Sequence, residues 1–112
     1  MKVIYIAAPY SIGDKEENVR RAIDAADMVM KLGGAPVNPL LSHYHEQLFP
    51  HKYDEWMRVD FAILAKCDAV YRVSGESPGA DSETTIAEMV HGIPVFRQDE
   101  TGGLEGLINF LR

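Results

Sequence analysis

The segment Ala69–Phe96 constrains the fold of this chain more than any other. An apolar run at Ala69–Tyr71 leads into a loop with two glycines, a helical pattern at Thr84–His91 and a second apolar run at Ile93–Phe96. This succession is typical of a βαβ unit, in which the two strands run parallel. In open parallel sheets, ligands bind in loops at the carboxyl ends of the strands. The glycine-bearing loop is therefore the first place to search for a functional site.

The rest of the chain continues the alternation. The apolar run at Lys2–Ala8 is rich in β-branched residues and indicates a strand buried on both faces. The clearest helix follows at Asp14–Leu32, where the spacing of Asp14 and Glu17 resembles a capping box. The other expected elements are a strand at Ala35–Pro39, an irregular segment at Leu40–Tyr53, a helix at Asp54–Lys66, a strand at Asp68–Val73 and a helix at Leu104–Leu111.

Alternating strands and helices predict an α/β protein with one domain over residues 1–112. We expect a flavodoxin-like three-layer sandwich with a four- to five-stranded parallel sheet, strand order 2-1-3-4, and helices on both faces. The ligand crevice then lies between the first and third strands. That order gathers three segments at one rim of the sheet, namely Ala7–Ser11, Asn38–His45 and Ser74–Glu83.

Composition excludes several classes of partner. A net charge of −6 with scattered Lys and Arg argues against binding of a nucleic-acid duplex, which requires a basic face. No apolar run approaches the roughly 20 residues needed to cross a membrane, and the run at Val3–Ala8 is too short for a signal peptide. The single cysteine, Cys67, excludes an internal disulfide framework and suits a reducing cytosol. We therefore expect a cytoplasmic protein.

Glu83 is the strongest candidate for chemistry. The sequence places it in the first turn of a helix that Asp81 or Ser82 can cap, where the partial positive charge favours an ionised carboxyl group. An ionised carboxylate in that position suits a nucleophile or an anchor for a ligand hydroxyl, although first-turn acids also serve as plain caps. Ser74 and Gly79, with the helix N-terminus, suggest either a phosphate cradle or a generic tight turn.

Other polar residues allow two readings each. Tyr10 follows the first strand, where its ring can stack on a base or sugar or pack at the surface. Asp60 lies on a mostly apolar helix and either contacts a substrate or is solvated. His43, His45 and His51 have no cysteine partners with zinc-site spacing, so we expect no metal. Neither a Walker A sequence nor a dinucleotide fingerprint is present, and we expect no cofactor.

Three motifs in order resemble the nucleoside 2-deoxyribosyltransferase superfamily, most closely a small, functionally undefined branch of it. They are Ile-Tyr-Ile-Ala-Ala-Pro-Tyr at residues 4–10, Asp60 followed by Asp68-Ala69-Val70, and Gly79-Ala80-Asp81-Ser82-Glu83 followed by Gly92-Ile93-Pro94-Val95. The resemblance spans nearly the whole chain and implies the flavodoxin-like fold. It also implies a homodimer or larger homo-oligomer.

The resemblance implies attack by a glutamate on C1′ of a nucleoside or nucleoside monophosphate, so that the base leaves. A second base then accepts the sugar in a transferase, or water accepts it in an N-glycosidase. Glu83 would be the nucleophile, Tyr10 and Asp60 would shape the base and sugar site, and Ser74 would face a 5′-phosphate. Substrate contacts are thus expected at Ala8, Pro9, Tyr10, Asp60, Ser74, Gly79 and Asp81.

One spacing departs from the family. The family usually has eight steps from the glutamate to the glycine before the last strand, whereas Glu83 to Gly92 is nine steps. Either the helix register shifts or the loop absorbs one residue; Glu88 would sit mid-helix, a poorer position for a nucleophile. Two alternatives remain open: a non-catalytic nucleotide-binding module on the same fold, and a phosphoribohydrolase.

Overall fold

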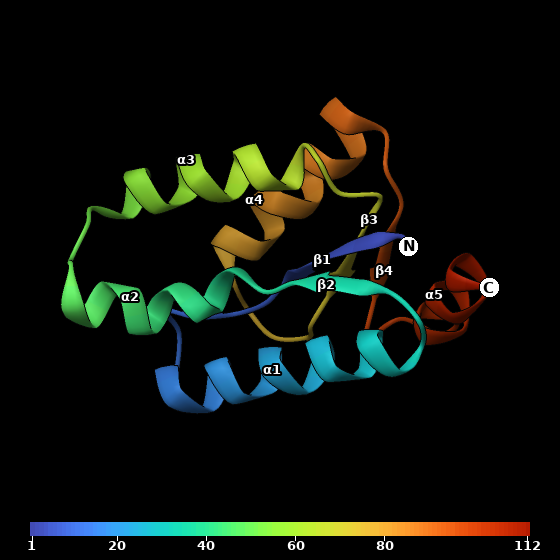
Figure 1. Cartoon of the computed structure of the whole chain (residues 1–112), viewed down its shortest axis with the longest axis horizontal. Helices are drawn as coiled ribbons and strands as arrows, with labels where there is room; N and C mark the ends of the chain where they lie inside the picture. The colour runs from blue at the N-terminus through green and yellow to red at the C-terminus, as the bar shows by residue number, and fades with distance from the viewer.

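A four-stranded parallel sheet forms the middle layer of the protein in a computed structural model that describes residues 1–112 (Figure 1). The strand order is β2-β1-β3-β4, and each neighbouring pair runs parallel. The predicted order and the α/β class are confirmed. The strands are β1 (Val3–Ala7), β2 (Ala35–Val37), β3 (Ala69–Arg72) and β4 (Val95–Arg97).

Helices cover both faces of the sheet. In Figure 1, α1 lies below the sheet and α3 and α4 lie above it, while α5 lies beside β4. None of the helices combines the length and apolar character that crossing a membrane requires. The helical segments are α1 (Lys15–Lys31), the 3-10 turn η1 (Pro39–Leu41), α2 (Ser42–Leu48), α3 (Tyr53–Leu64), α4 (Pro78–Ile86), the π-helical segment η2 (Ala87–His91) and α5 (Gly103–Leu111).

The apolar run of β1 supplies both cores of the protein. Ile4 and Ile6 pack into the cluster on the α1 and α5 side, whereas Tyr5 and Ala7 pack into the cluster on the α3 and α4 side. All four side chains are at most 1% exposed. Side chains alternate between the two faces of a strand, so a strand covered on both faces has no position for a solvated residue.

The segment Leu40–Tyr53 is helical for most of its length, so its predicted irregularity is wrong. The Asn38 side chain accepts a hydrogen bond from the Leu40 amide at 3.1 Å and caps η1. Pro39 then occupies the first helical position, where its missing N–H group removes no helical hydrogen bond. Pro39 therefore starts a helical turn, and β2 ends at Val37 instead of continuing to Pro39 as predicted.

The helix after the glycine-bearing loop begins earlier than predicted. The Ser77 hydroxyl accepts a hydrogen bond from the Ala80 amide at 3.1 Å, and Pro78 is the first residue of α4. Asp81 therefore lies inside the first turn and does not cap the helix. As a consequence Glu83 lies in the second turn of α4, not in the first.

The π-helical segment η2 continues α4 and ends at Gly92, which adopts a left-handed conformation with φ of +63°. A π turn holds one residue more than an α turn. The nine-step spacing from Glu83 to Gly92 is accommodated by this register shift, because the loop before β4 begins directly after the helix.

Candidate active site

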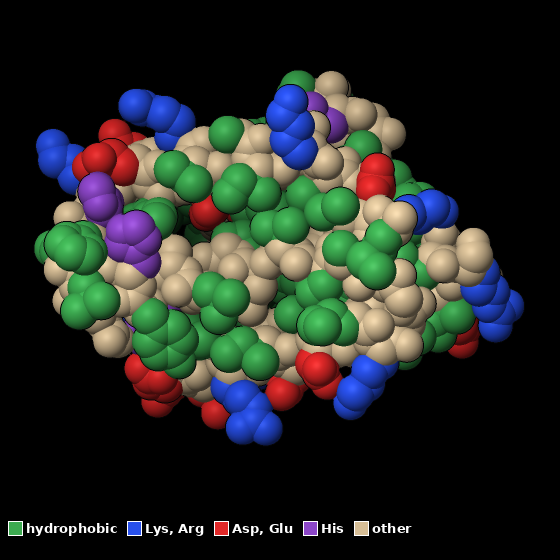
Figure 2. Space-filling view, viewed as in Figure 1, with side chains coloured by type: hydrophobic (Ala, Val, Ile, Leu, Met, Phe, Trp, Pro, Cys, Tyr) green, Lys and Arg blue, Asp and Glu red, His purple; other side chains and the backbone are tan.

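A cavity of about 300 Å³ opens beyond the carboxyl end of β1. Its walls come from the loop after β1, the η1 and α2 segment, α3 and the start of α4. Figure 2 shows the hollow between α3 and the α2 segment, with acidic side-chain atoms visible inside it. A cavity of this size suits one small organic ligand. The polar and aromatic side chains in its walls are Tyr10, Ser11, Ser42, His43, Glu46, Tyr53, Trp56, Asp60, Ser77 and Glu83.

Glu83 lies at the back of this cavity. Its side chain projects from α4 and the residue is only 6% exposed. The Tyr5 hydroxyl, which rises from the middle of β1, donates a hydrogen bond to Oε2 of Glu83. No protein group binds Oε1, and no buried polar side-chain atom in the protein lacks a partner. Oε1 is therefore accessible from the cavity.

Burial decides the protonation of Glu83. It raises the pKa of this carboxyl to about 7, against the hydrogen bond from Tyr5, which lowers it. The negative charge of Asp60 raises this pKa further, and the positive charge of Arg72 lowers it. The expectation that a helix N-terminus holds Glu83 ionised is therefore wrong, because the residue lies one turn further along α4 and is desolvated.

Asp60 on α3 faces the same cavity. Burial raises the pKa of its carboxyl group to about 6. Two carboxyl groups that share one cavity and titrate near neutral pH are common in sites of acid–base and nucleophilic catalysis. The pair Asp60 and Glu83 can supply one protonated and one ionised carboxyl at the same pH.

Tyr10 lines the cavity from the loop after β1. Its hydroxyl oxygen lies 2.7 Å from Nδ1 of His43, and Nε2 of His43 lies 2.8 Å from a carboxylate oxygen of Glu16. Burial, followed by the charges of Glu46 and Glu16, raises the pKa of the Tyr10 phenol. The ring therefore keeps its hydroxyl proton at neutral pH.

Five of the proposed site residues share this cavity, and three do not. Those in its walls are Ala8, Tyr10, Asp60, Gly79 and Glu83. Pro9 instead packs against the loop after β3, because a Cβ atom placed on Gly75 would lie 3.0 Å from Pro9 Cγ.

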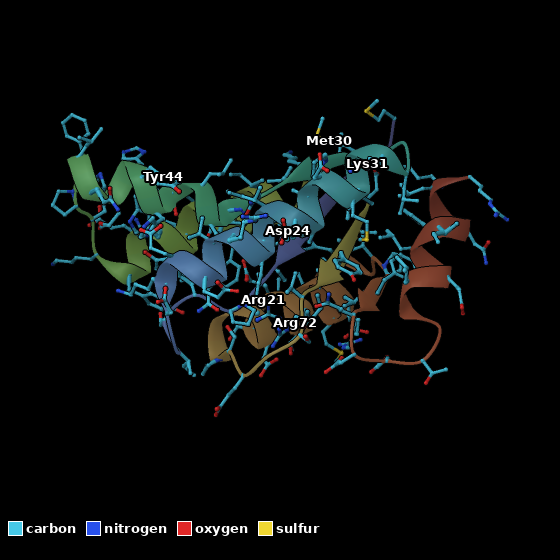
Figure 3. The ribbon with its side chains drawn as sticks, turned by 90° about the horizontal axis from the view of Figure 1, so that it is seen from below. Arg21, Asp24, Met30, Lys31, Tyr44 and Arg72 are labelled. Carbon is cyan, nitrogen blue, oxygen red and sulfur yellow. The ribbon has the colours of Figure 1, made fainter.

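Ser74 and Asp81 also lie outside the cavity walls, where two arginines hold them. Arg72 donates to Asp81 at 2.9 Å and to the Gly75 carbonyl at 2.9 Å. Arg21 of α1 donates to the Ser74 carbonyl and hydroxyl at 2.8 and 3.2 Å. Figure 3 labels both arginines, Arg21 on α1 and Arg72 on β3. These contacts brace the loop between β3 and α4.

Sequence reasoning missed Tyr5, Glu46 and Trp56, as well as the role of His43. One signal for Tyr5 exists in the sequence, since a tyrosine in a strand buried on both faces needs a partner for its hydroxyl. For the others no such signal exists, because α2 was expected to be irregular. The Trp56 indole donates to Glu46 at 3.3 Å beside the cavity.

His45 and His51 form an aromatic cluster with Trp56. The rings of His45 and His51 meet the Trp56 ring edge-on, with centroids 4.9 and 5.4 Å away. No group of three or more His, Cys, Asp or Glu residues is arranged to hold a metal ion. The cluster lies at the α2 end of the molecule, where Figure 2 shows two neighbouring groups of histidine atoms.

The chain belongs to the family described as "Domain of unknown function (DUF7768)", whose model matches residues 2–97. It is similar in structure to a 2-deoxyribosyltransferase from the psychrotolerant bacterium Bacillus psychrosaccharolyticus, described as a biocatalyst for the synthesis of antiviral and antitumoral nucleosides. That match has a TM-score of 0.61 and 21% identity, and it covers 85% of this chain and 70% of the other. No curated protein matches the chain. The structural match establishes a shared fold.

Proposed function

We propose that this protein is a nucleoside or nucleotide N-glycosyl enzyme, a deoxyribosyltransferase or an N-glycosidase, with Glu83 as the nucleophile. The observation that carries the proposal is the buried Glu83 carboxylate, held on one oxygen by Tyr5 and open to the cavity on the other. A positioned carboxylate with one free oxygen is what a covalent glycosyl-enzyme mechanism requires.

Glu83 and Asp60 have different roles in the proposed reaction, as nucleophile and as general acid. Oε1 of ionised Glu83 attacks C1′, and the bond between C1′ and the base nitrogen breaks with its electron pair going to the base. Protonated Asp60 gives its proton to the departing base. Water or a second base then attacks C1′, which releases Glu83 and returns a proton to Asp60. The pKa values of about 7 for Glu83 and about 6 for Asp60 place both groups near neutral pH, and the form with ionised Glu83 and protonated Asp60 is about tenfold less populated than the form with the opposite charges. The reaction therefore proceeds through this minor singly protonated form.

The cavity walls support a nucleoside as the ligand. Trp56, Tyr10 and Tyr53 offer aromatic surface on which a base can stack. Gly79 lies close to Tyr53, since a Cβ atom there would be 3.1 Å from the Tyr53 hydroxyl. A larger residue at this position would narrow the cavity, so we assign Gly79 to substrate access.

We propose further that the protein acts as a cytoplasmic homodimer or larger homo-oligomer. Exposed apolar side chains on α2 and the start of α3 lie beside the cavity mouth. They are Tyr44, Leu48, Phe49 and Tyr53, which are 49–76% exposed. Figure 3 shows Tyr44 on the outer side of α2. The buried thiol of Cys67 suits a reducing compartment.

Release of free base tests the proposal. The wild type and a Glu83→Gln variant are incubated with a panel of deoxynucleosides and deoxynucleoside monophosphates, with and without an acceptor base, and products are followed by chromatography. We expect release by the wild type and loss of at least about a thousandfold in the variant. Glu76→Gln is the matched control, because Glu76 is exposed. Equal release by both variants, or none from a folded wild type, would refute the proposal; the second result would favour a non-catalytic nucleotide-binding module.

A further inference from the structure

Glu16, His43 and Tyr10 form a chain of hydrogen bonds that leads from the surface to the cavity. Nε2 of His43 lies 2.8 Å from Glu16 and Nδ1 lies 2.7 Å from the Tyr10 hydroxyl. His43 is 8% exposed, whereas the Glu16 side chain is 68% exposed. The Gln47 amide lies 3.1 Å from the same Nε2 atom. The catalytic scheme above uses only the ring of Tyr10 and gives this chain no role.

The chemistry of the three groups fixes the direction of the hydrogen bonds. The Glu16 carboxylate only accepts and is nearer to Nε2 of His43, at 2.8 Å, than the Gln47 amide nitrogen at 3.1 Å. Nε2 therefore carries the proton and donates to the charged partner, and the Gln47 nitrogen makes no hydrogen bond to it in this tautomer. A neutral imidazole has one N–H group, so Nδ1 is an acceptor and the Tyr10 hydroxyl donates to it. The phenol oxygen consequently offers only lone pairs to the cavity.

Charge in the cavity has one sign. Glu46, Asp60 and Glu83 are in its walls, and no lysine or arginine is among the lining residues. The ammonium group of Lys15 lies over the Tyr10 ring at 5.4 Å from its centroid, and Lys15 does not line the cavity. The charged side chains of the site therefore offer only acceptors and negative charge to a ligand, and its side-chain donors are neutral hydroxyls such as those of Ser11, Ser42 and Tyr53.

We propose that the Glu16–His43–Tyr10 chain makes this cavity select nucleosides with free hydroxyl groups over nucleoside 5′-monophosphates. A ligand hydroxyl can donate to the phenol oxygen of Tyr10. A phosphate brings only acceptors and about two negative charges at neutral pH, and it meets lone pairs and carboxylates. Tyr10 is thus a specificity-determining residue, and His43 and Glu16 are positioning residues that act through it. This inference rests on the proposed function for the assignment of nucleosides as the ligand class.

Only part of the predicted phosphate site lies at the cavity. Gly79 and the start of α4 are in its walls, whereas Ser74 is outside, which agrees with this selection. The family resemblance implies that Ser74 faces a 5′-phosphate. In the structure Arg21 and Gln98 bind Ser74 outside the cavity. Arg72 is engaged by backbone carbonyls and by Asp81. The two arginines beside this loop are therefore occupied, and neither extends into the cavity walls.

Tryptophan fluorescence measures binding without relying on catalysis. Trp56 is the only tryptophan of the chain and lies in the cavity wall. The protein is titrated with deoxyadenosine and with deoxyadenosine 5′-monophosphate, at about pH 8, where an ordinary imidazole is neutral. Readings are taken within seconds of mixing, with excitation beyond the absorption of the base. We expect the monophosphate to bind at least tenfold more weakly than the nucleoside.

Glu16→Gln tests the hydrogen-bond chain. A glutamine amide can donate to Nε2 of His43, which moves the ring proton to Nδ1 and frees the Tyr10 hydroxyl to donate into the cavity. We expect the affinity ratio of nucleoside to monophosphate to fall severalfold. Glu17→Gln is the matched control, because it removes the same charge from the same exposed turn without touching His43. The effect of Glu16→Gln should persist in high salt, which screens surface charge.

Tyr10→Phe removes the acceptor and should weaken nucleoside binding severalfold, with less effect on the monophosphate. A monophosphate that binds the wild type as tightly as the nucleoside would overturn the inference. An unchanged affinity ratio in Glu16→Gln, or an equal change in Glu17→Gln, would overturn the role of the chain. Binding of neither ligand would overturn the inference together with its ligand class. Nucleoside binding without base release would leave this inference standing and refute the proposed catalysis.

Discussion

Replacing Glu83 with glutamine should make the protein more stable at alkaline pH. Glutamine keeps the shape of the side chain, and its carbonyl oxygen can still accept the hydrogen bond from Tyr5. The substitution removes the free-energy cost of burying a charged carboxylate, because Glu83 is only 6% exposed. A functional residue held in a site that penalises its charged form is a common origin of such gains.

The pKa of Glu83 sets the magnitude and its pH dependence. Burial raises this pKa from 4.5 to about 7, so the folded protein holds a proton that the unfolded chain has lost. Wild-type stability is therefore complete below about pH 4.5 and falls as the pH rises to about 7. The difference of about 2.5 pH units at about 1.4 kcal/mol each is about 3 kcal/mol. Glu83→Gln should gain about 3 kcal/mol at pH 8 and under about 0.5 kcal/mol at pH 4.5.

Urea unfolding followed by circular dichroism at both pH values measures the effect. The exposed Glu76→Gln variant is the control and should change stability by less than about 0.5 kcal/mol at either pH. An equal gain at both pH values would show that packing, not ionisation, is responsible. No gain at pH 8 would show that Glu83 is not desolvated in the folded protein, and the site geometry would have to be revised.

Three further predictions follow from the same contacts. Tyr5→Phe removes the donor to Glu83, so the pKa of Glu83 should rise. A pH–rate profile should then show the pH of half-maximal base release moving up by about one unit. Gly103→Ala should destabilise the protein by more than about 2 kcal/mol in urea unfolding, because its Cβ atom would lie 1.9 Å from the Arg97 carbonyl oxygen. Phe49 is 66% exposed, so Phe49→Lys should shift light scattering from a dimer or larger species to a monomer; a wild-type monomer would contradict the proposed assembly.

Short sequence patterns predicted correctly those helix ends that depend only on neighbouring residues. Asp14 caps α1 and accepts from the Glu17 amide at 3.0 Å, as the spacing of the two residues indicates. The boundaries failed where two local signals competed. Ser77 and Asp81 are both good capping residues, and only the position of Pro78 in the folded chain decides that Ser77 caps α4.

The candidate site was predictable only in part. Glu83, Asp60 and Tyr10 follow from the resemblance, and the place of Glu83 and Tyr10 at one rim follows from parallel strand order. Ser74 in the preceding loop and Asp81 in α4 are close to Glu83 in sequence, and local sequence does not distinguish them from it. In the structure Arg21 binds Ser74 and Arg72 binds Asp81, outside the cavity.

Periodicity along the chain was enough to predict the α/β class and the strand order, and the family resemblance singled out Glu83. The chemistry of that carboxyl group depends on the tertiary structure. Tyr5 and Glu83 are 78 residues apart and meet across the β1 and α4 interface. Tyr10 and His43 meet 33 residues apart, between a loop and α2. A pKa and a hydrogen-bond direction depend on burial and on partners distant in sequence, and no local pattern encodes either.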